Sequence, residues 1–216
     1  MSDRPWIVGI TGASGTVYAR RLIRVLLEAV PEIKLEVIFS EGALRVMKEE
    51  EGFISSVGRI SIPELIGIPT DRVTVHSNRN IAATIASGSY LTQGMIIVPC
   101  SMKTLAAVAH GYSDNLIQRA ADVVLKERRR LVLVPRESPL SEIHLENMLK
   151  LSRMGVYMVP AMPGFYNLPN SISDLIDSMV MRIIDQMGLE VNVQKRWGEL
   201  QREAKQQLIS GGVVSE

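Results

Sequence analysis

The sequence predicts an α/β fold, a doubly wound parallel sheet with helices on both faces. Short apolar runs alternate with amphipathic helical segments five or six times along the chain. Residues 94–100 form a continuous apolar run, as expected for a strand that a parallel sheet buries on both faces. A glycine-rich turn at residues 9–15 joins the first apolar run to the first helical segment. In such folds, ligands bind outside the carboxyl ends of the strands.

The first strand is predicted over residues 6–10 and the first helix over 17–30, because Val17, Leu22 and Val25 fall on one helical face. The glycines between them allow a ligand to approach the backbone. The free N–H groups of the first helical turn favour an anion, and phosphate is the natural candidate. An ordinary tight turn explains the same residues, so the turn alone leaves both interpretations open.

The next predicted elements are a strand over residues 34–39 and a helix over 41–51. Glycine and proline interrupt every pattern between residues 52 and 71, so this stretch is predicted to be an irregular loop. An alternating pattern over residues 72–76 predicts another short strand before the apolar run at 94–100.

The remaining predicted elements are helices over residues 105–109, 115–129, 140–153 and 171–187, and strands over 131–134 and 156–159. Ser171 is suited to cap the last helix, with Asp174 in the capping-box position. We expect a single domain over residues 1–216, with a C-terminal helical tail from about residue 190.

Composition excludes several classes of function. The 24 basic and 23 acidic residues give a net charge of +1, so no overall field attracts nucleic acid or an anionic membrane. No run of about 18 uncharged apolar residues indicates a membrane span. Cys100 is the single cysteine, which excludes an intramolecular disulfide framework and favours a reducing compartment. We therefore expect a cytoplasmic protein.

The side chains that follow the predicted strands are mostly hydroxyls. They are found among Thr11 to Ser14, at Ser40, among Ser101 to Thr104, and near Tyr166, with Arg136 and Glu137 after the strand at 131–134. Hydroxyls and backbone N–H groups are neutral donors suited to a phosphate ester, and Arg136 can add a bidentate contact. Each hydroxyl alone is most often a helix cap. Their recurrence after three strands favours a ligand site.

The predicted helix at 115–129 carries a polar stripe of Asn115, Arg119, Asp122 and Lys126, spaced for one face. A solvated charged face is the usual explanation of such a stripe. The basic run at 126–130 is likewise typical of a solvated helix end.

Other common sites lack their required residues. No Gly-Lys pair occurs, which excludes a P-loop, and no tyrosine has a lysine four residues later, as a short-chain dehydrogenase requires. Ser40 stands where a dinucleotide site places an acidic residue. His76, His110 and His144 are too scattered to indicate a metal site, so no metal is expected.

Several segments together resemble the flavin prenyltransferases, a family formerly described as aromatic-acid decarboxylases of the ubiquinone pathway. The segments are residues 9–15, 86–89, 99–105, 115–123, 125–129, 134–137, 144–148 and 163–166. The similarity extends in order from about Trp6 to Trp197. It implies a flavodoxin-like Rossmann fold in a large homo-oligomer, a dodecamer, with active sites at subunit junctions.

The resemblance implies a metal-independent reaction that joins a dimethylallyl group, from dimethylallyl phosphate, to N5 and C6 of reduced FMN. Phosphate is released, and the prenylated FMN serves a separate UbiD-type decarboxylase. In this reaction a basic group can stabilise the leaving phosphate, and a carboxylic acid can supply a proton to it.

The family pattern also implies roles for individual residues. The expected FMN-binding residues are Gly12, Ala13, Ser14, Ser40, Ser101, Met102, Lys103, Thr104, Arg119 and Arg136. The expected catalytic residues are Glu137 as acid–base group, Lys126, Ser14, Ser87 close to the flavin, and Glu50 lining the pocket. The expected donor-binding residues are Lys126, Tyr166, Arg182 and the tail aromatic Trp197.

Two departures and two alternatives accompany the resemblance. Thr84 stands where the family often has proline, and residues 52–75 match no family motif. A flavin-dependent cysteine decarboxylase would carry an active-site histidine and a Pro-x-Met-Asn loop, whereas Pro163 is followed by Gly-Phe-Tyr-Asn. A non-catalytic FMN-binding accessory protein would not need Lys126, Glu137 and Arg182, and the presence of all three favours catalysis.

Overall fold

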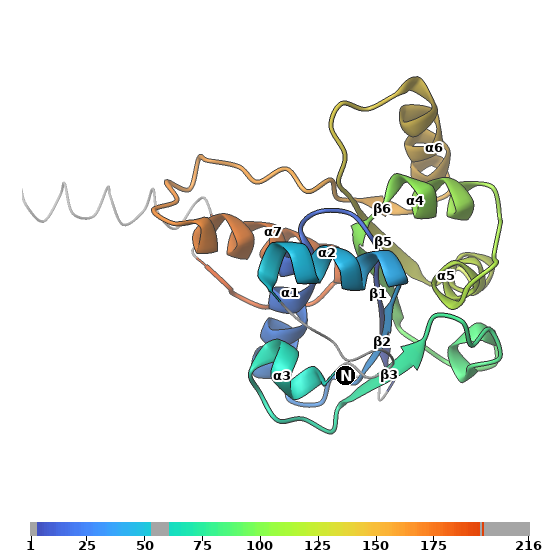
Figure 1. The fold of residues 1–216 in the computed structure, drawn as a ribbon, viewed down its shortest axis with the longest axis horizontal. Helices are drawn as coiled ribbons and strands as arrows, with labels where there is room; N and C mark the ends of the chain where they lie inside the picture. Colours follow the sequence, from blue (N-terminus) through green and yellow to red (C-terminus); the bar gives the residue numbers. More distant parts are fainter. Residues whose placement is uncertain (1–3, 53–60, 195, 197–216) are drawn as a thin grey trace, which may run out of the picture.

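The computed structural model describes residues 4–52, 61–194 and 196, and Figure 1 shows their arrangement. They contain a six-stranded sheet in which every pairing is parallel, in the order β3-β2-β1-β4-β5-β6. The strands are β1 (Trp6–Ile10), β2 (Leu35–Phe39), β3 (Val73–Ser77), β4 (Gly94–Cys100), β5 (Arg130–Pro135) and β6 (Tyr157–Met158). The predicted doubly wound α/β fold is confirmed.

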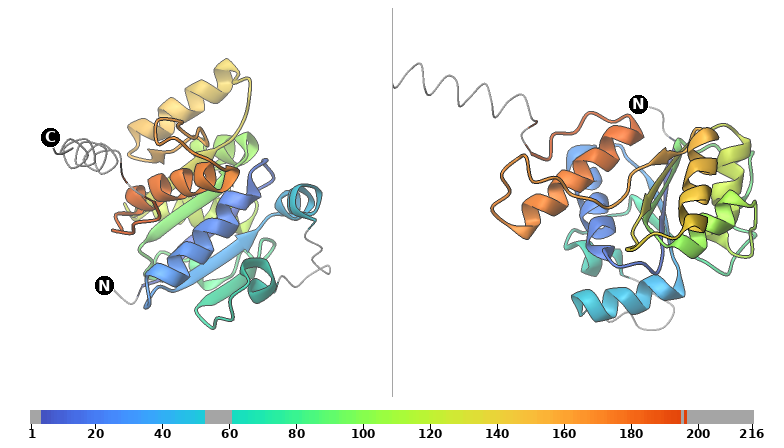
Figure 2. Two further views of the ribbon diagram at one scale, coloured as in Figure 1. Left: turned by 90° about the vertical axis from the view of Figure 1, so that its left-hand side faces the viewer. Right: turned by 90° about the horizontal axis from the view of Figure 1, so that it is seen from above.

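Helices cover both faces of the sheet (Figure 2). They are α1 (Thr16–Ala29), α2 (Glu41–Glu51), α3 (Ile62–Ile66), the 3-10 helix η1 (Thr84–Ala86), α4 (Met102–Ala109), α5 (Leu116–Lys126), α6 (Glu142–Arg153) and α7 (Ile172–Met187). One apolar core lies under α1, α2, α3 and α7, and the other lies under α4, α5 and α6.

Strand alternation sends neighbouring side chains into these two cores. Val8, Ile96 and Val132 belong to the core under α1 and α7. Ile7 and Ile97, each next in sequence to one of these residues, belong to the other. Because β1 and β4 are paired and buried on both faces, their sequences are apolar almost throughout. The strand order reverses between these two strands, which places the ligand crevice beside their carboxyl ends.

Serine and asparagine caps start most of the helices, as their positions in the sequence suggest. The side chains of Ser40, Ser61, Ser101, Asn115, Ser141 and Ser171 each accept a hydrogen bond from the third residue beyond them. The capping box predicted for Ser171 and Asp174 is confirmed. Each such cap contributes about 1 kcal/mol to the free energy of unfolding.

Three sequence-based boundaries were wrong. The loop predicted over residues 52–71 contains α3, because Pro63 lies in the first turn, where a missing N–H costs nothing, and Gly67 ends the helix at φ 73°. Helix α4 begins at Met102, because Ser101 caps it, rather than at residue 105. Strand β6, predicted over residues 156–159, is only two residues long.

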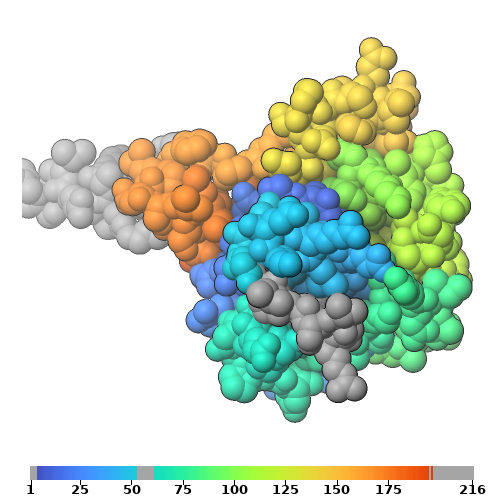
Figure 3. Space-filling model, viewed as in Figure 1, coloured from blue at the N-terminus to red at the C-terminus, as the bar shows by residue number. Residues whose placement is uncertain are grey.

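The chain between β6 and α7 extends away from the sheet as an arm, drawn in orange in Figures 1 and 3. We call residues 159–171 the arm. Phe165 and Leu168 are 68% and 80% exposed, and Ile172, at the start of α7, is 77% exposed. Residues 190–194, where a helical tail was predicted, contain no helix. Trp197 lies outside the described residues.

Candidate active site

The glycine-rich turn after β1 holds a carboxylate at the start of α1. Gly15 is the N-cap of α1 at φ 100°, a conformation that favours glycine. Its N–H donates to Oε2 of Glu50 at 3.0 Å. The Thr16 hydroxyl donates to Oε1 of Glu51 at 2.8 Å and lies 3.4 Å from the same Glu50 oxygen. The structure therefore places Glu50, from the end of α2, where the sequence alone predicted a phosphate. The same turn brings Ser14 beside Glu50, since the Ser14 hydroxyl is a further hydrogen-bond partner.

The surroundings of Glu50 favour its charged form. Partial burial raises the pKa of the carboxyl. Hydrogen bonds from Ser14, Gly15 and Thr16 together lower it by more than burial raises it, so the net pKa lies below its ordinary value. A carboxylate at a helix N-terminus is also favoured by the helix dipole. Glu50 is thus a fixed negative charge at the mouth of the predicted crevice.

Replacing Glu50 with Gln is expected to lower Tm by about 2 °C at neutral pH, because the helix N-terminus loses its charge partner. A depressed folded-state pKa gives stability that is complete above the unfolded-state pKa and lost as the pH falls through the folded-state value. The Tm difference between wild type and Glu50→Gln should therefore be constant above about pH 5 and shrink as the pH falls below the ordinary glutamate pKa of about 4.3. A difference that grew in acid would contradict this assignment.

Gly12 has a packing reason to be glycine. A Cβ built there would lie 2.9 Å from the Cα of Gly42, in the first turn of α2, and neither backbone can move aside easily. The close approach joins the turn after β1 to the start of α2 and leaves Gly12 exposed. Ala13, by contrast, is buried. Gly42 was not among the predicted site residues.

The hydroxyls after β2 and β4 are helix caps. The Ser40 oxygen accepts from the Ala43 N–H at 3.0 Å, and the Ser101 oxygen accepts from the Thr104 N–H at 3.3 Å. Ser101 also donates to the hydroxyl of Thr104 at 3.1 Å. Ser40 keeps its O–H free of any described acceptor, so it can still donate to a ligand. Of their neighbours, Met102 packs in the core and Lys103 is exposed.

Thr11 joins the two strands at the point where the strand order reverses. Its hydroxyl donates to the carbonyl oxygen of Pro99 at 2.8 Å and accepts from the N–H of Ser101 at 2.7 Å. The side chain is 1% exposed, so neither partner can turn to water when the hydroxyl is removed. This pair of bonds fixes the separation of the two turns that border the crevice.

Replacing Thr11 with Val should destabilise the fold by about 2 kcal/mol, because a buried donor and a buried acceptor lose their partner. Thr11→Ser is the matched control, since it keeps the hydroxyl and loses only a methyl group, at about 1 kcal/mol. Urea unfolding of both variants measures the difference. If serine were as destabilising as valine, packing rather than hydrogen bonding would explain the position.

The polar stripe of α5 is internally paired rather than simply solvated. Arg119 Nη1 lies 2.9 Å from Asp122 Oδ2, and Lys126 forms an ion pair with Glu127. Lys126 lies over the backbone of Gly88, since a Cβ built there would be 2.7 Å from its Nζ. The structure therefore brings Lys126 beside the loop that carries Ser87.

The prediction that residues 126–130 form a solvated helix end was wrong for its last two members. Helix α5 ends at Lys126, and Arg130 already belongs to β5. Arg130 donates to the carbonyl oxygen of Gln186 at 2.9 Å and lies 5.0 Å from the ring centroid of Tyr157. Arg129 donates to backbone oxygens of Gly88 and Tyr90. Two members of this basic cluster, Arg129 and Arg130, therefore bind backbone oxygens of other segments.

Arg136 and Glu137 directly follow β5, as predicted, and both are exposed. The N–H of Arg136 donates to the Cys100 carbonyl oxygen at 3.4 Å, which holds this turn beside the end of β4. The Glu137 carboxylate accepts from the N–H of Ser138 at 3.0 Å. Both side chains are therefore open to solvent just after the carboxyl end of β5.

Tyr166 and Arg182 line one cavity of about 500 Å³ at the end of β6, between the arm and α7. Arg182 Nη1 lies 2.9 Å from Asp185 Oδ2, and Arg196 contacts the same carboxylate at 2.8 Å. The structure thus gathers these two predicted donor-binding residues on one surface.

Lys126 and Arg182 lie in different layers of the molecule. Helix α5 packs on one apolar core and α7 on the other, with the sheet between them (Figure 2). Lys126 accordingly does not line the cavity that contains Tyr166 and Arg182. Within one protomer, Lys126 therefore does not lie with Tyr166 and Arg182.

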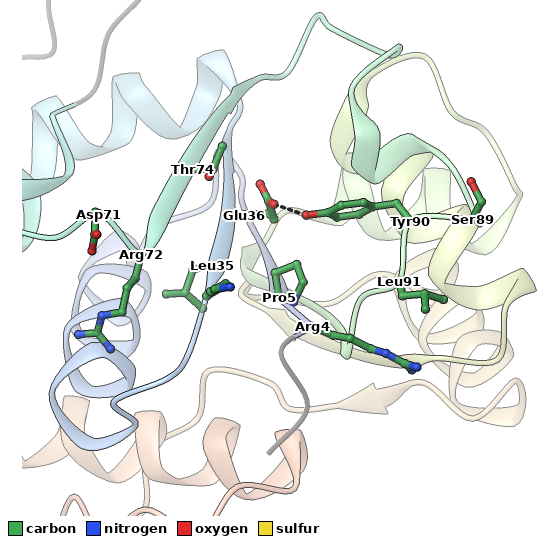
Figure 4. A pocket seen from close by; sticks show the side chains of 11 residues that line it. Arg4, Pro5, Leu35, Glu36, Asp71, Arg72, Thr74, Ser89, Tyr90 and Leu91 are labelled. Atoms are coloured by element: carbon green, nitrogen blue, oxygen red, sulfur yellow. Dashed lines mark hydrogen bonds between the residues drawn. The ribbon is translucent and has the colours of Figure 1, made fainter.

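A hollow of about 650 Å³ lies at the amino ends of β1 and β2 and is lined in part by Ser89, Tyr90 and Leu91. Figure 4 shows Tyr90 pointing into it toward Glu36. The Tyr90 hydroxyl donates to Glu36 Oε1 at 2.7 Å, and His76 Nε2 lies 2.5 Å from Glu36 Oε2. We locate the active site by the strand ends rather than by the size of this hollow.

No group of three or more His, Cys, Asp or Glu side chains among the described residues could hold a metal ion. His110 contacts Asn147 at 3.0 Å, and His144 completes the capping box of α6. None of the described helices is both long enough and apolar enough to cross a bilayer.

Residues 1–184 match the family described as Flavoprotein. The flavin prenyltransferase UbiX of Alkalihalophilus pseudofirmus is 50% identical over 192 residues, which cover 89% of this chain and 95% of the relative. That of Methanocaldococcus jannaschii is 44% identical over 192 residues, covering 89% and 97%.

The chain is also similar to solved structures. A dodecameric FMN-dependent UbiX-like decarboxylase from Escherichia coli O157:H7 is 48% identical, with a TM-score of 0.80, and the match covers 89% of this chain and 98% of the other. A UbiX protein in complex with FMN and dimethylallyl pyrophosphate is 42% identical, with a TM-score of 0.80 and coverage of 90% and 97%. The FMN-dependent cysteine decarboxylase SpaF is 14% identical, with a TM-score of 0.54 and coverage of 82% and 96%, and shares the fold alone.

Proposed function

The chain belongs to the flavin prenyltransferases, and we infer that it joins a dimethylallyl group to N5 and C6 of reduced FMN, releasing phosphate and producing prenylated FMN. Identity of 50% over 89% of the chain to a flavin prenyltransferase is the observation that carries this conclusion. FMN supplies the electron-rich ring that accepts the prenyl group. All other contributions come from side chains of the protein.

We propose that the turns after β1, β2 and β4 bind FMN. Gly12 exposes backbone without a side chain, and the Ser40 hydroxyl is able to donate. Arg136 adds a cation at the neighbouring strand end. Gly12, Ala13, Ser14, Ser40, Ser101, Met102, Lys103, Thr104, Arg119 and Arg136 form the proposed flavin-binding set. The buried members, Ala13, Met102 and Thr104, shape the turns rather than contact the ligand.

We propose that Lys126, Tyr166 and Arg182 bind the phosphate of the donor, with Trp197 closing the site. As phosphate leaves, its growing charge is stabilised by the lysine and arginine cations. Glu137 supplies or accepts the proton that the leaving phosphate requires, and Ser87 lies beside the flavin. Ser14 and Glu50 line the pocket.

We propose a homo-oligomer, a dodecamer, as the active form. A relative of this chain is described as dodecameric. The arm exposes Phe165 and Leu168 to solvent, and burying a side chain of this size contributes about 1.5–3 kcal/mol. Because Lys126 and Arg182 lie in different layers, assembly also explains how they meet at one phosphate.

We further propose that the donor is dimethylallyl phosphate, that the product serves a UbiD-type decarboxylase, and that the reaction takes place in the cytoplasm. The relative solved with dimethylallyl pyrophosphate makes the diphosphate the alternative donor. Cys100, the only cysteine, is a buried free thiol, in keeping with a reducing compartment.

The deciding experiment is anaerobic incubation of the protein with reduced FMN and dimethylallyl phosphate, followed by mass analysis of the extracted flavin. A flavin heavier by one five-carbon unit is the expected result. A parallel reaction with the diphosphate identifies the preferred donor. Unmodified flavin with both donors, despite intact FMN binding, would contradict the proposed activity of this chain.

A further inference from the structure

Arg129, which lies outside the proposed catalytic set, forms hydrogen bonds with the loop that carries Ser87. We call residues 87–92, which connect η1 to β4, the Ser87 loop. Arg129 donates from Nη2 to the Gly88 carbonyl oxygen at 2.6 Å, and from Nη1 to that of Tyr90 at 2.8 Å. Nη1 also lies 3.3 Å from the Thr92 hydroxyl. A planar guanidinium is suited to such a fork of acceptors, which an ammonium cannot span.

The backbone turn at the end of α5 directs the Arg129 side chain toward this loop. Arg128 adopts φ 55°, and the N–H of Arg129 then bonds back to the carbonyl oxygen of Val124 at 2.9 Å. This turn leaves Arg128 exposed and directs its neighbour to the Ser87 loop. Lys126, which ends the same helix, lies over Gly88. The helix end therefore fixes Lys126 and the Ser87 loop relative to each other.

The loop is also anchored on its other side. The Tyr90 hydroxyl donates to Glu36, which His76 also contacts. Burial raises the pKa of the Glu36 carboxyl. Its bonds to His76 and Tyr90 together lower the pKa by more than burial raises it, so Glu36 is held as a carboxylate. Burial and the bond to Glu36 raise the pKa of Tyr90 to about 12, so the phenol stays a donor. The Ser87 loop is thus held from two sides, with Ser87 itself exposed.

We propose that Arg129 is a positioning residue for prenyl transfer, which holds the Ser87 loop so that Ser87 keeps its place against the flavin. This inference rests on the proposed function. Arg129 contacts no reacting atom and acts through the loop. Displacing a reacting group by about 1 Å costs up to about 100-fold in rate, so a loosened loop affects turnover before binding.

A double-mutant cycle tests the proposal on the full-length protein. Arg129→Gln should lower kcat about tenfold and leave the Kd for FMN within about threefold. Added to Ser87→Ala, the same change should cost less than about twofold, because the group that Arg129 positions is already absent. Arg129→Lys, with charge but no fork, should fall between wild type and Arg129→Gln. Arg128→Gln, an exposed neighbour of the same type, should match the wild type.

Additive effects of Arg129→Gln and Ser87→Ala on kcat would overturn the proposal. A lowered Tm of Arg129→Gln with unchanged kcat would also overturn it, because that result is expected of an arginine that only stabilises the fold. Should Arg129→Gln fail to fold, Arg129→Lys takes its place in the cycle. Hydrogen exchange at residues 88–92, expected to rise in Arg129→Gln but not in Arg128→Gln, reports the loop independently of turnover. A wild type that formed no prenylated flavin would overturn the proposed function and this inference together.

Discussion

Co-assembly of a Lys126→Ala chain with an Arg182→Ala chain is expected to restore about a quarter of wild-type turnover, whereas each variant alone should be about 100-fold slower. The two cations lie on helices that pack on opposite faces of the sheet. If one phosphate contacts both, they must come from different protomers. In a random one-to-one mixture, about a quarter of such sites receive both wild-type residues.

A second mixture separates this arrangement from a site within one chain. Wild type mixed with a chain carrying both substitutions should also give about a quarter of the turnover if the residues come from different protomers. If they came from one protomer, this mixture would give about half, and the mixture of single variants would give none. In each mixture the two chains are unfolded and refolded together, and turnover is measured per flavin bound. Equal values in the two mixtures are the expected result.

The fold could be predicted because its information is local. Apolar runs such as residues 94–100 follow from burial on both faces, and capping residues such as Ser171 mark helix starts. The failures are local too. Pro63 was interpreted as a breaker, although at a helix start it is well tolerated. At one edge of the sheet, β6 has two residues, fewer than the four predicted over residues 156–159.

The site was less predictable, because its contacts join residues far apart in sequence. The rule that ligands bind at strand ends selected the turns at Thr11 and Ser101, but it could not show that Glu50 would occupy the start of α1. The contacts of Arg129 with the Ser87 loop span about 40 residues and leave no periodic pattern. One signal was visible: Glu36 is a charged residue in the middle of a predicted buried strand, which requires a partner.

Glu137→Gln is expected to slow prenyl transfer by about two orders of magnitude or more while sparing FMN binding, the usual scale for a general acid–base group. The carboxylate lies exposed just after β5, and its one described contact, with the Ser138 N–H, is one that a glutamine oxygen can also make. The substitution therefore removes the exchangeable proton and keeps the shape. Glu142→Gln, an exposed carboxylate in the first turn of α6, is the control and should turn over normally.

The comparison with Lys126→Ala assigns the loss at Glu137 to a chemical step. Removing a phosphate-binding cation should raise the KM for the donor as well as lower kcat, whereas losing only a proton donor should lower kcat with little change in KM. If Glu137→Gln raised KM alone, Glu137 would be a binding residue. Unchanged turnover would remove it from the mechanism, and phosphate would then depart against the Lys126 and Arg182 cations without a protein acid, as a fully ionised leaving group.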